Sequence, residues 1–104
     1  MRRRCLALAA SLLALPLVAR AQTLPGLRMQ GLRCLQNAAP SACKSFLETS
    51  YRLKKQAEAA KQLRCYTALL GFEAQVIAAR GAGAAEPGLE AGFSELTAEC
   101  VQIR

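Results

Sequence analysis

Four cysteines constrain this chain more than any other feature. They stand at Cys34, Cys43, Cys65 and Cys100, each on the apolar stripe of a segment with helical periodicity. An even number of cysteines in an exported chain is the pattern of a disulfide framework. We therefore expect two covalent bridges to hold a set of helices together.

The start of the chain predicts export. Residues 2–4 are three arginines, an apolar run covers residues 5–19, and Ala19-Arg20-Ala21 is a small-x-small pattern that suits cleavage after Ala21. The apolar run is about 15 residues long, shorter than the roughly 20 that cross a bilayer. We expect a cleaved signal peptide at 1–21, which takes Cys5 with it, and a single helical domain at 22–104. A twin-arginine signal is the alternative to the general export route.

The charge of the chain belongs partly to this signal. Loss of the four arginines in residues 1–21 takes the formal net charge from +7 to +3. Such a charge is ordinary for a soluble domain and gives no reason to expect a nucleic-acid partner. A domain of this size has a small hydrophobic core, so its disulfides matter for stability.

The first two helices are separated by a proline. Residues 22–26 read as an extended lead-in, and helical spacing begins at Leu27. Pro40 ends this first helix near residue 38, and Ser41 is a suitable N-cap for the next. The second helix, about 42–61, is the most amphipathic segment of the chain.

The third helix, about 64–80, has few polar residues. Leu70 and Ile77 lie well around the helix from the Cys65–Ala79 stripe, which is typical of a central, buried helix. Gly71 within it suggests close approach by a neighbour. The apolar stripes of 42–61 and 64–80 differ in direction by roughly 90°, so we expect a hairpin that turns near residues 61–64 and not one long rod.

A Gly- and Ala-rich connection over 81–88 leads to a final helix, about 88–103. Glu86 and Glu90 near its start suit the positive end of the helix dipole. The predicted fold class is all-α: a small up-down bundle of three to four helices, stapled by two disulfides.

The helix order chooses one cysteine pairing. Cys34 and Cys43 flank the first turn, whereas Cys65 and Cys100 meet at the opposite end of the bundle. A bridge from Cys43 to Cys65 would have to span most of a helix, roughly 27 Å, and a disulfide tolerates at most about 6.8 Å between Cα atoms. We expect Cys34–Cys43 and Cys65–Cys100, which contribute about 2.7 and about 3.8 kcal/mol in the loop-entropy model.

The residue types for most chemistries are missing. The chain has no histidine and no aspartate, and all seven of its acids are glutamates. Serine and threonine hydroxyls therefore lack a histidine base, and zinc lacks its usual nitrogen ligands. The cysteine spacings contain no C-x-x-C, the usual redox motif. We expect no enzyme, no metal and no cofactor.

The sequence favours a binding protein. The candidate surface is the second helix, and its candidate partner-binding residues are Tyr51, Arg52, Lys54, Lys55 and Lys61. A protein partner, in the manner of an inhibitor, immunity or assembly protein, is the leading hypothesis. The expected compartment is the periplasm, with the extracellular space as the alternative.

Two other roles remain as alternatives. One is a carrier of a small apolar ligand or lipid, held between the last two helices around Leu69, Phe72, Val76, Phe93 and Leu96. The other is contact of the cationic second helix with a membrane surface, which Glu48 and Glu58 disfavour because they dilute its charge. The same two glutamates argue against nucleic-acid binding.

Overall fold

The fold is a bundle of four helices joined by short turns. The structure is a computed structural model that describes residues 23–37, 39–83 and 88–101, and these contain helices and turns but no strand. The helices are α3 (Leu24–Gln36), α4 (Ser41–Ala59), α5 (Leu63–Gly81) and α6 (Leu89–Glu99). The predicted all-α class is confirmed. The predicted signal peptide lies outside the described residues, as does Glu86.

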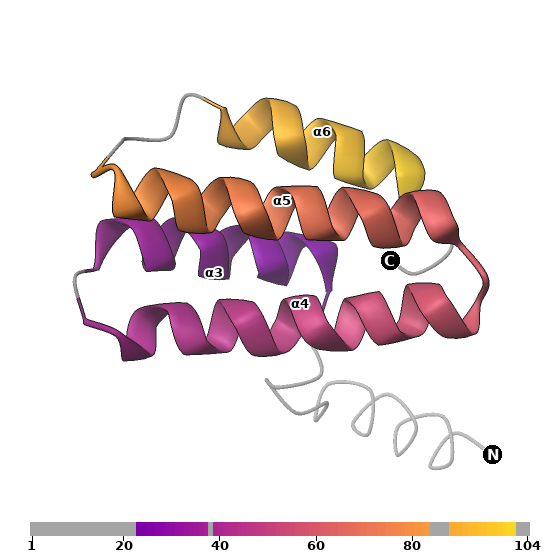
Figure 1. The fold of residues 1–104 in the computed structure, drawn as a ribbon, viewed down its shortest axis with the longest axis horizontal. Coiled ribbons are helices and arrows are strands. Elements are labelled where there is room, and N and C mark those ends of the chain that lie inside the picture. The colour runs from indigo at the N-terminus through magenta and orange to yellow at the C-terminus, as the bar shows by residue number, and fades with distance from the viewer. Residues whose placement is uncertain (1–22, 38, 84–87, 102–104) are drawn as a thin grey trace, which may run out of the picture.

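Successive helices run in opposite directions (Figure 1). In that view α5 lies between α4 and α6, and α3 lies behind, between α4 and α5. Helix α5 packs against all three of the others, so it is the central element of the bundle. The predicted hairpin is confirmed, since α4 ends at Ala59 and α5 begins at Leu63.

Both predicted disulfides are confirmed. Cys34–Cys43 joins α3 to the start of α4 with Cα atoms 4.4 Å apart, and Cys65–Cys100 joins the start of α5 to the end of α6 at 4.7 Å. All four cysteines are buried. Each bridge therefore pins one pair of helices, α3 to α4 and α5 to α6, at opposite ends of the bundle.

The first helix starts earlier than expected. It begins at Leu24, so the expectation of an extended lead-in over 22–26 is wrong in its second half. The Thr23 side chain accepts a hydrogen bond from the backbone N–H of Gly26 at 3.1 Å, and Pro25 stands in the first turn. A threonine cap followed by proline in the first turn is a strong helix start, and it outweighs the Leu-Pro-Gly composition.

Ser41 is not the cap of α4. The helix follows Pro40, which already has helical backbone angles, and no side chain caps it. The turn before it is held from elsewhere: the guanidinium of Arg80 donates to the carbonyls of Asn37 and Ala39, at 3.4 and 3.2 Å. The Asn37 side chain also holds this turn, by accepting a bond from the Ala39 N–H at 2.9 Å, and the helix begins at Ser41, one residue before the expected start.

The core is built around aromatic rings. The Phe46 and Phe72 ring centroids lie 6.1 Å apart, and Phe72 and Phe93 lie 6.2 Å apart, both pairs tilted. Gly31 lets α3 approach this cluster, since a Cβ atom built there would lie 3.3 Å from the Phe46 ring. The ring cluster thus links α3 and α4 to α5 and α6.

Helix α5 is central but not buried on all sides. Leu70 and Ile77 are 47% and 41% exposed, and no atom lies within 4 Å of a Cβ built on Gly71. The expectations of burial all round and of a close neighbour at Gly71 are therefore wrong. The physical reason is that three helices cover only part of the circumference of a fourth.

Candidate functional site

The candidate surface is the outer face of α4. Six residues of this helix are buried and point into the bundle: Cys43, Phe46, Thr49, Ser50, Leu53 and Ala57. The opposite side of the helix is exposed and carries a mixture of charged, aliphatic and aromatic residues: Lys44, Leu47, Glu48, Tyr51, Arg52, Lys55 and Glu58. These seven residues are called the α4 outer face below.

Tyr51 lies at the centre of this face. It is 59% exposed, and Leu47, one turn before it, is 39% exposed. The ammonium of Lys55, one turn after it, lies 5.6 Å from the centre of the tyrosine ring. A cation over an aromatic face is attracted to it, by about 0.5–1 kcal/mol at an exposed site. The three residues form a continuous ridge that offers an aromatic ring with an aliphatic neighbour and a positive charge.

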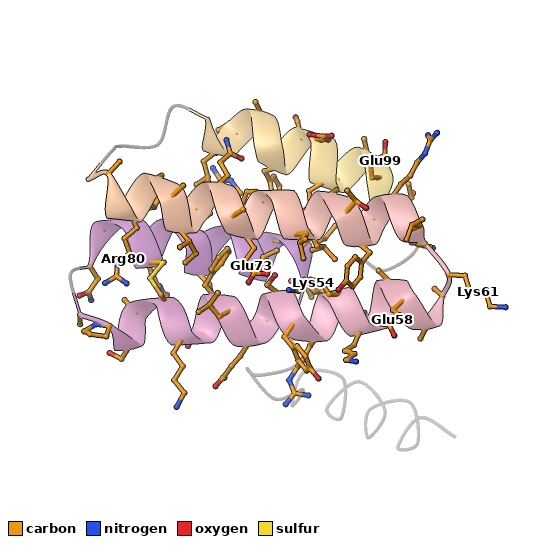
Figure 2. All side chains as sticks on the ribbon, in the orientation of Figure 1. Lys54, Glu58, Lys61, Glu73, Arg80 and Glu99 are labelled. Atoms are coloured by element: carbon orange, nitrogen blue, oxygen red, sulfur yellow. A yellow bond between two sulfur atoms is a disulfide. The ribbon has the colours of Figure 1, made fainter. Side chains whose placement is uncertain are left out.

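Lys54 does not belong to the α4 outer face. Its side chain is only 16% exposed, and its ammonium pairs with the Glu73 carboxylate of α5 at 2.7 Å (Figure 2). The same carboxylate accepts a hydrogen bond from the buried Ser50 hydroxyl at 2.8 Å. The structure therefore corrects the expectation that Lys54 lies on an exposed face, because this residue joins α4 to α5.

Lys61 lies in the α4–α5 turn, away from Tyr51. It is exposed and has a left-handed backbone (φ 57°), the conformation that reverses the chain between the two helices. A shallow groove of about 370 Å³ lies beside it, lined by Ala57, Glu58, Lys61, Gln62, Leu63 and Tyr66. Of the five sequence-predicted partner residues, the structure thus brings together Tyr51, Arg52 and Lys55 and sets Lys54 and Lys61 apart.

The residues considered for an apolar ligand belong to the core. Leu69, Val76 and Leu96 have no exposed surface, and Phe72 has 2%. Phe93 is partly buried and packs against the same cluster. A groove of about 650 Å³ runs beside Phe72 between α5 and α6, open to the surface, with Arg64, Glu95 and Glu99 among its lining residues. The apolar side chains are occupied in packing against one another.

Three hydroxyl groups of the bundle donate hydrogen bonds within the fold. The Ser50 hydroxyl donates to Glu73, that of Thr67 to the Leu63 carbonyl at 2.9 Å, and that of Thr97 to the Ser94 carbonyl at 2.9 Å. Ser50 is also fully buried, so its contact with Glu73 cannot face a substrate. Within the described ranges, no three or more histidine, cysteine, aspartate or glutamate residues are placed to hold a metal ion.

Sequence reasoning missed the exposed apolar residues of α5. Leu63, Leu70 and Ile77 are the most apolar side chains on the surface of that helix, and Leu63 is 77% exposed. Their seven-residue spacing was visible in the sequence. The sequence predicts burial of Leu70 and Ile77, because the stripe opposite, through Cys65, is apolar as well, and it makes no prediction for Leu63.

Comparison of the chain with protein-family models, with curated proteins and with solved structures finds no match. In the part of the chain that the structure describes, no helix is both long and apolar enough to cross a membrane. The function of this chain therefore has to be inferred from its surface, above all from the α4 outer face.

Proposed function

We propose that this chain is a small exported binding protein, without enzymatic activity, that engages a protein partner through the α4 outer face. The observation that carries the proposal is the exposed Tyr51 ring with Leu47 and Lys55 beside it. Tyrosine and arginine are enriched among residues that dominate the energy of protein interfaces, and Arg52 borders this ridge. A tyrosine side chain has few rotatable bonds, so it loses little conformational entropy for the area that it buries on binding.

The surroundings of Tyr51 indicate the kind of partner. Lys44, Arg52 and Lys55 alternate with Glu48 and Glu58 around it, all exposed. A mixed-charge rim around an apolar centre is the usual anatomy of a protein interface. It is a poor membrane-binding face, because an anionic lipid surface attracts an unbroken cationic one. The partner should therefore offer a recess for the tyrosine with both charge signs at its edge.

The proposed compartment is the periplasm, with the extracellular space as the alternative. Two buried disulfides are compatible with an oxidising compartment, where such bonds form and persist. The apolar-carrier role has less support, since Leu69, Phe72, Val76 and Leu96 are packed against each other in the core. An inhibitor, immunity or assembly role fits a rigid scaffold that presents one face.

The test is site-specific photo-crosslinking from Tyr51. The full chain is expressed with export, and a photoreactive phenylalanine analogue replaces Tyr51. We expect one crosslinked species of defined mass in the exported fraction. Adding Lys55→Glu should reduce its yield at least about tenfold, because the charge beside the ring is reversed. Thermal unfolding should be unchanged.

The matched control is Arg33→Glu, a charge reversal at an exposed arginine in the last turn of α3. It alters net charge by the same amount away from the α4 outer face and should leave the crosslink intact. A crosslink that survives Lys55→Glu, or one that Arg33→Glu reduces equally, would contradict this surface as the binding site.

A further inference from the structure

The outer side of α5 carries an uncharged stripe that no other described helix covers. Its members are all exposed and recur at alternating steps of four and three residues along the whole helix: Leu63, Thr67, Leu70, Ala74, Ile77 and Gly81. This is the spacing with which one helix packs lengthwise against another. These six residues are called the α5 seam below.

Covering the seam would leave no unmet polar group on it. The Thr67 hydroxyl already donates to the Leu63 carbonyl at 2.9 Å. Glu73, which borders the seam on the α4 side, is neutralised by Lys54 at 2.7 Å and accepts a bond from Ser50. Burial of unpaired polar groups is the main penalty for covering a helix face, and no side chain of the seam itself carries one.

The order of side-chain sizes along the seam is self-complementary. In an antiparallel pair centred on Phe72, each large residue lies opposite a smaller one: Leu63 opposite Gly81, Ile77 opposite Thr67, and Leu70 opposite Ala74. A parallel pair would instead place leucine against leucine and glycine against glycine, which leaves crowded and empty layers in turn. Even layers of one large and one small side chain pack best.

Gly71 lies beside the centre of this arrangement, on the α6 side. A Cβ built on it would have no atom within 4 Å, so its own bundle gives no packing reason for glycine. Glycine within a helix costs about 1 kcal/mol relative to alanine. In the antiparallel pair, the Gly71 residues of the two copies meet next to the two-fold axis, where a missing side chain permits close approach.

We propose that the α5 seam is the interface of an antiparallel, two-fold symmetric dimer of this chain. An isologous contact of this kind uses the same patch on both copies, as the sequence of the seam requires. A helix of 19 residues is about 28 Å long and about 10 Å wide, which gives roughly 300 Å² of contact per copy from α5 alone. Stable interfaces bury about 800 Å² per partner, so the dimer is a weak one, with a dissociation constant that is micromolar or higher. The proposal concerns a different face from the α4 outer face and stands independently of it.

The first measurement is sedimentation velocity of the oxidised protein, purified after export of the full chain, from about 5 µM to about 1 mM. We expect a monomer–dimer equilibrium in rapid exchange. Leu70→Glu should raise the dissociation constant at least about tenfold, since each dimer contains the substitution twice. Leu47→Ala removes a comparably exposed residue from α4 and should leave the constant unchanged. A protein that stays monomeric to 1 mM, or a dimer indifferent to Leu70→Glu, would overturn the proposal.

A size swap tests the register. Leu70→Ala alone empties the two central layers, and Ala74→Leu alone overfills them, so each should weaken the dimer several-fold. The double variant restores one large and one small residue in each layer and should return the constant to within about threefold of the original. Filtered nuclear Overhauser contacts in a mixed-label dimer should join the Leu63 methyls to Gly81 of the second copy. Contacts between the two Leu63 residues, or a double variant weaker than both single ones, would exclude this register.

Discussion

Helices α4 and α5 are antiparallel neighbours of equal length, 19 residues each, yet their outer sides differ in kind. The α4 outer face mixes lysine, arginine and glutamate with one tyrosine and one leucine, whereas the six residues of the α5 seam include no charged residue. Charge on α4 keeps that face hydrated, so the proposed partner would have to displace this water. The uncharged seam loses little when it is covered, so it suits a weak, symmetric contact. One small bundle thus has two surfaces that differ in what covering them costs: water must be displaced from charged groups on α4, but not from the seam of α5.

Removal of a disulfide should have the largest effect on stability. Each disulfide fixes a different pair of helices and so supports a different face. Replacing both Cys65 and Cys100 by serine should lower the free energy of unfolding by about 3.8 kcal/mol, and the same change at Cys34 and Cys43 by about 2.7 kcal/mol. The difference follows from the sequence separations of the bridged cysteines, 35 and 9. Urea unfolding monitored by helical circular dichroism measures both.

Loss of the first bridge should damage the α4 side and loss of the second the α5 side. We therefore expect the Cys65 and Cys100 variant to weaken dimerisation more than the Cys34 and Cys43 variant does. Equal stability losses, or helical content that melts at the original temperature after reduction, would contradict the role of the bridges as the main staples.

Lys54 and Lys55 are adjacent in the sequence, but Lys54 makes a contact between two helices whereas Lys55 lies on the surface. Lys54→Met should lower the free energy of unfolding by about 1–2 kcal/mol, because the Glu73 carboxylate, 24% exposed, loses its ammonium partner. Lys55→Met should change it by less than about 0.5 kcal/mol, since this side chain is exposed. Paired urea titrations of the two variants make the comparison. If both variants unfolded alike, the Lys54–Glu73 pair would contribute nothing to the contact between the helices.

The smallest expected effects on stability come from two glycines, Gly71 in α5 and Gly31 in α3. Gly71→Ala should stabilise the monomer by about 0.5–1 kcal/mol, because the position is open and alanine favours helix. Gly31→Ala should not give this gain, because the added Cβ meets the Phe46 ring at 3.3 Å and the strain of that contact offsets the better helix propensity of alanine. Thermal unfolding at low concentration measures the difference between the two variants. The same Gly71→Ala variant should weaken the dimer, so that a gain in monomer stability accompanies a loss of association.

Much of the fold followed from periodicity and spacing. Apolar stripes at three- and four-residue steps located all four helices, and the change of stripe direction near residues 61–64 located the hairpin. The cysteine pairing followed because a helix is too long for a disulfide to span. The capping of α4 was predicted less well: the turn before it is held in part by Arg80, which is some 40 positions further along the chain.

The candidate site was predicted in part. Tyr51, Arg52 and Lys55 lie on the exposed side of α4, as their place on the amphipathic pattern indicated. Lys54 does not lie on this side. At 100° per residue it falls at the border between the exposed and the buried side of α4, and only the position of Glu73 on α5 decides which way its side chain turns.

The sequence by itself determined the helices, their order and the two bridges of this protein, because periodicity, chain reach and disulfide geometry are local or nearly local constraints. Only the tertiary structure decided which apolar residues are core and which are surface. Helix α5 has apolar residues on opposite sides, through Phe72 and through Leu70, and its own pattern cannot rank them. The number and position of its neighbours do: three helices bury the side with Phe72 and leave the side with Leu70 free to meet a second molecule.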